Sequence, residues 1–213
     1  MVCRFVPVLW EEVTVKSIII FMCCLLVFGI VQSVAQAKNV TQIDYIYDPG
    51  ILKPIDSQLK VSIGEPAPLF SLPSISGQQI HLEQYRGKKN VVLSFVPAAW
   101  TPVCSDQWPG YNIVQRIFDE HNAVLIGITV DNIPTLHAWV RQMGTLWFDV
   151  LSDFWPHGEV AAKYGVLRTD GTADRSLVFI DKKGVIREII VADINTRPGL
   201  EELVMALKKM NAN

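Results

Sequence analysis

The residue best suited to chemistry is Cys104. It is the one cysteine of the chain that lies beyond the first 37 residues, so it has no nearby cysteine with which to form a structural disulfide. It follows a buried strand candidate and comes just after Pro102, a residue type favoured in the first turn of a helix. Backbone N–H groups at a helix start are unpaired and form the positive end of the helix dipole, which stabilises a thiolate. This position favours a nucleophilic cysteine. The alternative for a lone cysteine is an inert thiol that packs as a small hydrophobic side chain.

The elements that would position Cys104 alternate between buried strands and amphipathic helices. Runs rich in β-branched residues predict strands buried on both faces, and apolar residues at helical spacing predict helices. The order predicts one α/β domain of the thioredoxin-like fold, with a mixed central β-sheet flanked by helices and an N-terminal strand extension. The expected elements are short strands at 70–72 and 79–82, a strand at 90–96, a helix at 102–121 bent near 109–110, a strand at 123–130, helices at 133–143 and 158–164, a strand hairpin at 175–180 and 185–191, and a helix at 197–210.

The N-terminal region has the layout of an export signal. Residues 17–31 carry no charge, Lys16 precedes them, and Ala35-Gln36-Ala37 follows shortly after. A basic residue, a short apolar core and an A-x-A end are typical of a secretory signal peptide. The run is shorter than the ~20 residues that span a bilayer. We therefore predict export to a periplasmic or extracytoplasmic site with residues 1–37 removed, an uncleaved membrane anchor being the alternative.

The rest of the chain divides into residues 38–59, a leader without clear periodicity, and residues 60–213, the predicted domain. With 19 basic and 21 acidic residues the chain has a net charge of -2. A nucleic-acid-binding protein usually has a basic excess, so no nucleic acid is predicted as a partner. The four histidines show no ligand spacing, and a single cysteine cannot form a thiolate cage. Neither a metal nor another cofactor is predicted.

The segment Pro97-Ala98-Ala99-Trp100-Thr101-Pro102-Val103-Cys104 resembles the Pro-x-x-x-Thr-x-x-Cys active-site signature of the peroxiredoxins. Residues 63–70 (IGEPAPLF) resemble the opening motif of this family, and residues 85–88 (YRGK) its motif before the buried strand. Residues 174–181 (DRSLVFID) resemble the late strand that brings in the arginine of the family. The resemblance extends over most of the predicted domain. It implies an enzyme that reduces hydrogen peroxide or organic hydroperoxides.

By this resemblance Cys104 is the peroxidatic nucleophile, Thr101 and Arg175 polarise the peroxide, and Pro97 shapes and dries the pocket. The chemistry agrees, since a hydroxyl can donate to or accept from a peroxide oxygen and a guanidinium presents several donors at once. Each residue also has an ordinary interpretation. Thr101 is expected to cap the helix as well, Arg175 could be a surface strand residue, and Pro97 could simply end the strand.

The sequence departs from the family pattern at two points. Gln107 stands where many relatives carry an acidic residue, three positions after the nucleophile. No cysteine follows Cys104, so the usual resolving cysteine is absent and the chain resembles a one-cysteine enzyme. Its sulfenic acid would need an external thiol reductant, either a thioredoxin-like protein or a small thiol. The resemblance also implies a homodimer.

Two other functions remain open from the residues. An exported thioredoxin-like thiol-disulfide oxidoreductase would need Cys-x-x-Cys, and Thr101 stands three positions before Cys104. A non-enzymatic binding domain on the same fold would not depend on the thiol.

Overall fold

The structure is a computed structural model, and it describes residues 45–211. The predicted signal peptide or anchor and the three N-terminal cysteines lie outside these residues. Within the described range, no helix combines the length and the apolar character needed to cross a bilayer.

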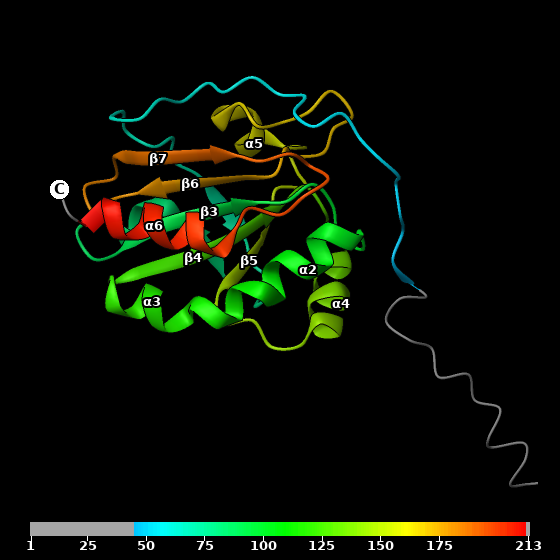
Figure 1. The fold of residues 1–213 in the computed structure, drawn as a ribbon, viewed down its shortest axis with the longest axis horizontal. Coiled ribbons are helices and arrows are strands. Elements are labelled where there is room, and N and C mark those ends of the chain that lie inside the picture. Colours follow the sequence, from blue (N-terminus) through cyan, green and yellow to red (C-terminus); the bar gives the residue numbers. More distant parts are fainter. Residues whose placement is uncertain (1–44, 212–213) are drawn as a thin grey trace, which may run out of the picture. The chain divides into compact units, whose positions relative to one another are not determined.

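The core of the fold is a five-stranded mixed sheet with the order β5-β4-β3-β6-β7 (Figure 1). The central strand β3 (Asn90–Phe95) is buried along its whole length. It pairs in parallel with β4 and antiparallel with β6. The predicted mixed sheet is therefore confirmed. The other strands of this sheet are β4 (Ala123–Thr129), β5 (Asp149–Ser152), β6 (Ser176–Ile180) and β7 (Ile186–Val191).

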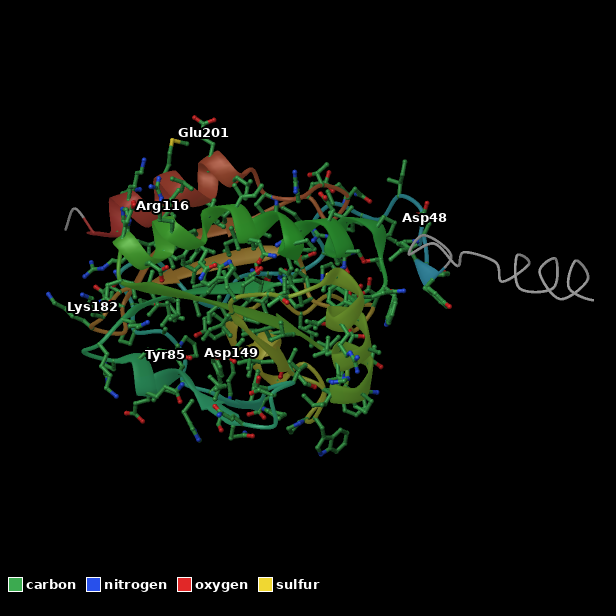
Figure 2. All side chains as sticks on the ribbon, turned by 90° about the horizontal axis from the view of Figure 1, so that it is seen from below. Asp48, Tyr85, Arg116, Asp149, Lys182 and Glu201 are labelled. Carbon is green, nitrogen blue, oxygen red and sulfur yellow. The ribbon has the colours of Figure 1, made fainter. Side chains whose placement is uncertain are left out.

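Each face of the sheet is covered by a separate apolar cluster. One cluster joins side chains of the sheet to helices α2, α3, α4 and α6, and the other joins the opposite face to α5 and the N-terminal strands. Figure 2 shows the two layers on opposite sides of the sheet, with Arg116 and Glu201 on one side and Tyr85 on the other. The helices are α2 (Pro102–Gly110), α3 (Gln115–Glu120), α4 (Ile133–Met143), α5 (Glu159–Tyr164) and α6 (Leu200–Asn211).

The predicted N-terminal extension is an antiparallel pair, β1 (Ser71–Pro73) and β2 (Gln79–His81). In both strands only the middle residue is buried, and these residues, Leu72 and Ile80, join the second apolar cluster. A short 3-10 helix, η2 (Leu82–Tyr85), leads from β2 toward the central strand. The predicted thioredoxin-like fold with its extra strand pair is therefore confirmed.

The structure differs from the sequence expectations in three elements. The single helix expected over 102–121 is three segments, because η3 (Tyr111–Val114) separates α2 from α3. Pro109 within α2 lacks an N–H donor, which explains the irregularity that follows it. The sequence does not predict strand β5, because four residues are too few to show the alternation of apolar and polar side chains that marks a strand. Helix α6 begins three residues late, because Pro198 disfavours helical geometry at the residue before it.

One close contact ties the sheet to α2. Gly127 on β4 lies against the Trp108 ring, and a Cβ atom at Gly127 would stand 2.7 Å from that ring. Trp108 is fully buried, and its indole nitrogen donates to the hydroxyl of Ser94 on β3 at 3.2 Å. The absence of a side chain at position 127 thus sets how closely α2 approaches the sheet.

Candidate active site

Cys104 lies in the first turn of α2, nine residues beyond Phe95 at the carboxyl end of β3. Pro102 occupies the start of the helix, as the sequence predicts. The thiol is free and has no exposed surface. In open α/β sheets, ligands bind at the carboxyl ends of the parallel strands, so the cysteine stands at the edge of the sheet where a substrate is expected.

Arg175 is brought to Cys104 by the pairing of β6 with β3. Ser176, the first residue of β6, lies opposite Phe95, the last residue of β3, so the preceding arginine reaches the start of α2. Its Nη2 atom lies 3.5 Å from the Cys104 Sγ atom. With an exposed fraction of 1%, Arg175 is not a surface strand residue, and that alternative is wrong.

The guanidinium of Arg175 is held by two neutral acceptors. Its Nε and Nη2 atoms donate to the carbonyl oxygen of Ile194 at 3.3 and 3.0 Å, and Nη1 donates to the Gln107 side-chain oxygen. Within residues 45–211, no carboxylate forms an ion pair with this guanidinium. Its positive charge is therefore available to an anion at the Cys104 sulfur.

Gln107 is the functional residue whose role the sequence left undefined. It is fully buried, and its amide nitrogen donates to the hydroxyls of Tyr111 at 2.9 Å and Ser94 at 3.3 Å. Burial raises the pKa of Tyr111, which keeps this partner a neutral phenol. Because the nitrogen is committed to two hydroxyls, the amide oxygen faces Arg175. The signal that could have found it is spacing, since residues three apart share a helix face.

Replacing Gln107 by Glu is expected to slow alkylation of Cys104 at neutral pH by about tenfold. A carboxylate would pair with Arg175 and withdraw its charge from the sulfur, so the thiolate would be less favoured. The measurement is the rate of reaction with iodoacetamide at pH 7. Gln115→Glu, at an exposed position on α3, adds the same charge away from the site and should leave the rate unchanged. Equal rates for the wild type and Gln107→Glu would contradict this electrostatic account.

Thr101 and Pro97 lie on the loop between β3 and α2. Thr101 is the N-cap residue of α2, but its side chain makes no capping bond, so the expected capping by its hydroxyl is wrong. The hydroxyl instead donates to the Ala98 carbonyl at 3.0 Å. The loop turns at Trp100, which has a φ of 63°, a left-handed conformation that costs a non-glycine residue roughly 1–3 kcal/mol. This turn directs the Thr101 hydroxyl back across its own loop.

A cavity of about 560 Å³ lies beside these residues. Pro97, Thr101 and Arg175 all line it, whereas Cys104 does not. Three of the four residues predicted from the sequence thus line one cavity, and the Sγ atom of the fourth, Cys104, lies 3.5 Å from the Arg175 Nη2 atom. Attack by the sulfur on a bound molecule requires a small opening of the wall between them. The remaining lining residues are Tyr47, Asp48, Pro49, Gly50, Ile51, Leu52, Ala98, Ala99, Pro102, Val103, Asp170, Thr172, Ile194 and Asn195.

The cavity offers proton donors and a guanidinium but no set of metal ligands. Across residues 45–211, no group of three or more His, Cys, Asp or Glu side chains is placed to hold a metal ion. The Cys104 sulfur next to the Arg175 guanidinium is a pair suited to nucleophilic chemistry.

Comparison with known proteins assigns the chain to a family. The sequence model of the AhpC/TSA family matches residues 63–189. Alkyl hydroperoxide reductase E of Mycobacterium tuberculosis is 37% identical over 128 residues, which cover 60% of this chain and 83% of that protein. Peroxiredoxin-1 of Gallus gallus is 34% identical over 154 residues, 67% of this chain and 76% of that protein.

Solved structures agree with the sequence relatives. The reduced 2-Cys peroxiredoxin of Plasmodium vivax superposes with a TM-score of 0.66 and 26% identity, covering 70% of this chain and 81% of that one. The residues matched by the AhpC/TSA sequence model include the β3–α2 loop, Cys104 and Arg175. The chain therefore belongs to the AhpC/TSA family, the family of the peroxiredoxins.

Proposed function

We propose that this peroxiredoxin is a one-cysteine thiol-dependent peroxidase with Cys104 as its nucleophile. Membership of the family gives reduction of a peroxide at the expense of a thiol. The observation that carries the assignment to Cys104 is the 3.5 Å approach of the Arg175 Nη2 atom to the Cys104 Sγ atom in a buried site.

In the first step the Cys104 thiolate attacks the terminal oxygen of a hydroperoxide. A sulfur–oxygen bond forms, the oxygen–oxygen bond breaks, and the sulfur is oxidised to a sulfenic acid. The departing oxygen takes up negative charge and then a proton, leaving as an alcohol or as water. Arg175 would stabilise this charge, and the Thr101 hydroxyl would do so after turning its proton away from the Ala98 carbonyl, because both residues line the cavity. Pro97, on the same wall, would help to exclude water.

In the second step an external thiol attacks the sulfenic acid, forming a mixed disulfide and releasing water. A second thiol then attacks this disulfide, restores the Cys104 thiol and leaves as the oxidised disulfide. The reductant is proposed from outside the molecule because Cys104 is the one free cysteine among the described residues. Either a small thiol or a thioredoxin-like protein supplies the necessary chemistry.

We expect one equivalent of hydrogen peroxide to convert Cys104 to a sulfenic acid that dimedone traps. Mass spectrometry of the digested protein measures the adduct, and continuous turnover with dithiothreitol as reductant measures catalysis. Protein pre-alkylated at Cys104 is the control, since it should form no adduct and consume no peroxide. Turnover without any adduct at Cys104, or no turnover with any thiol, would contradict the proposal.

We also propose that the enzyme is exported and forms a homodimer. Export is supported by the apolar run 17–31 followed by Ala35-Gln36-Ala37, which belong to the part of the chain outside the described residues. The dimer is supported by the position of β7 as the last strand at one side of the sheet, because an edge strand offers backbone donors and acceptors to a second copy.

A further inference from the structure

The leader is tied along its length to the domain that carries Cys104. Its described residues, 45–59, form no regular strand or α-helix, yet their backbone is bonded to distant side chains and loops. In Figure 2 Asp48 of the leader lies at the opposite end of the described domain from Lys182. The bonds join Tyr47 N to the Trp100 carbonyl at 2.7 Å, Leu52 N to Asn195 at 2.8 Å, Asn195 to the Leu52 carbonyl at 2.9 Å, Ile194 N to the Pro54 carbonyl at 3.0 Å, and Asp56 N and Ser57 N to Asp174 at 3.0 and 2.8 Å.

The carboxylate of Asp174 is the strongest of these tethers. It has no exposed surface, and besides the two leader amides it binds Arg168 at 2.5 Å. Arg168 in turn donates to the Lys53 carbonyl at 3.1 Å. A buried ion pair whose remaining hydrogen bonds go to the leader backbone holds that backbone in one place. Since Asp174 adjoins Arg175 in the chain, the tether and the active site share one short segment.

The leader supplies one wall of the active-site cavity. Residues 47–52 line it together with residues 97–99 and Val103. The match to the AhpC/TSA family begins at residue 63, so this wall comes from a part of the chain outside the matched region.

The cavity is much larger than a hydrogen peroxide molecule. A water molecule occupies about 30 Å³ in the liquid, and a second oxygen roughly doubles that volume. The cavity of about 560 Å³ lies in the range of sites that hold organic ligands, roughly 300–1,000 Å³. With the two peroxide oxygens placed between Thr101 and Arg175, most of the space toward the leader remains for another group.

The side chains in that remaining space favour an apolar group. Tyr47, Ile51 and Leu52 of the leader line the cavity together with Pro97 and its neighbours. Ile51 is 95% exposed and Tyr47 is 70% exposed, so both present apolar surface that a ligand could cover. Three polar residues of the lining are already bound to protein groups. Asp48 accepts from the Gly50 N–H, Asp170 binds Arg168 and Thr172, and Asn195 binds Leu52 and Asp193.

We propose that leader residues 47–52 determine substrate specificity, by binding the apolar substituent of an organic hydroperoxide whose two oxygens lie between Thr101 and Arg175. The inference rests on the proposed peroxidase function. Contacts to the substituent are made both before and during the reaction, so they act on KM more than on kcat. Hydrogen peroxide has no substituent and gains nothing from this wall.

The test compares kcat/KM for cumene hydroperoxide and for hydrogen peroxide in the full chain with dithiothreitol as reductant. Ile51→Glu should lower the cumene hydroperoxide value by about tenfold through KM, the scale of losing one apolar contact in a pocket. It should change the hydrogen peroxide value by less than about twofold, as surface substitutions do. Leu52→Ala should lower the ratio of kcat/KM for cumene hydroperoxide to kcat/KM for hydrogen peroxide. The leader should keep its position in this variant, because the backbone bonds of residue 52 to Asn195 remain.

Ile113→Glu is the matched control, because Ile113 is 78% exposed and lies on η3 away from the cavity. It should leave the ratio of the two substrates unchanged. Equal ratios in the wild type, Ile51→Glu and Leu52→Ala, with both peroxides consumed, would overturn the role of the leader and leave the peroxidase function intact. A wild-type protein that consumes neither peroxide would instead contradict the proposed function, and the inference with it.

Discussion

Replacement of Cys104 by Ser is expected to abolish peroxide consumption, with a loss on the order of 10⁶-fold, the scale of removing an enzyme's nucleophile. A serine hydroxyl is not ionised at neutral pH, and the β3–α2 loop contains no base to activate it. The fold should persist, since the two side chains differ by one atom in a fully buried position. The measurement is peroxide consumption with dithiothreitol, beside thermal unfolding of the same sample.

Cys104→Ser also separates the enzyme from a non-enzymatic binding domain on the same fold. A binding function that does not use the thiol would survive the substitution in a correctly folded protein. Thr101→Val removes the neighbouring hydroxyl and leaves the sulfur in place, so it tests the hydroxyl separately from the nucleophile. Peroxide consumption by Cys104→Ser above the rate of buffer alone would rule out Cys104 as the nucleophile.

Replacement of Arg175 by Lys is expected to lower kcat/KM by about 10²–10³-fold, the usual effect of losing one fixed donor at a developing charge. The guanidinium bonds Ile194, Gln107 and the Cys104 sulfur at once, and an ammonium group cannot present donors in that planar pattern. Some destabilisation is also expected, because the buried acceptors would lose partners. Steady-state kinetics with hydrogen peroxide and the unfolding temperature measure the two effects separately.

Arg187→Lys is the matched control for this prediction. Arg187 lies on β7 and binds Asp181 at 2.7 Å, so the same change is made at a guanidinium outside the active site. Its activity should stay within about twofold of the wild type. A similar loss in both variants would mean that arginine-to-lysine changes act on this protein through stability alone.

The parts of the fold that were predictable are those where burial sets a pattern. The apolar runs of β3 and β4 and the helical spacing of α4 each produced an element within one residue of its observed bounds. Pro97, Thr101 and Cys104 were named from the family resemblance, and of these three Pro97 and Thr101 line the cavity. Arg175 was placed by family resemblance, and the pairing of β6 with β3 is what carries it there.

The contribution of the leader could not be read from the sequence. Its position depends on bonds between residues far apart in the chain, such as Leu52 with Asn195, 143 positions away, and Asp56 with Asp174, 118 positions away. Such contacts leave no periodicity in the segment itself. The role of Gln107 was missed for a different reason. Helical spacing places it on the same face of α2 as Cys104, but two of its partners, Arg175 and Ser94, lie at other elements that only the fold brings to that face.

The contact between Gly127 of β4 and Trp108 of α2 makes the active site sensitive to a substitution in the sheet beneath that helix. A methyl group at position 127 would push the indole ring and with it the Ser94 hydroxyl that Gln107 also binds, so the displacement would reach the guanidinium through a relay of side chains. In a library of random variants, substitutions at position 127 should therefore lower activity although this residue lies outside the active site. Such a substitution would impair catalysis without changing any residue that lines the cavity.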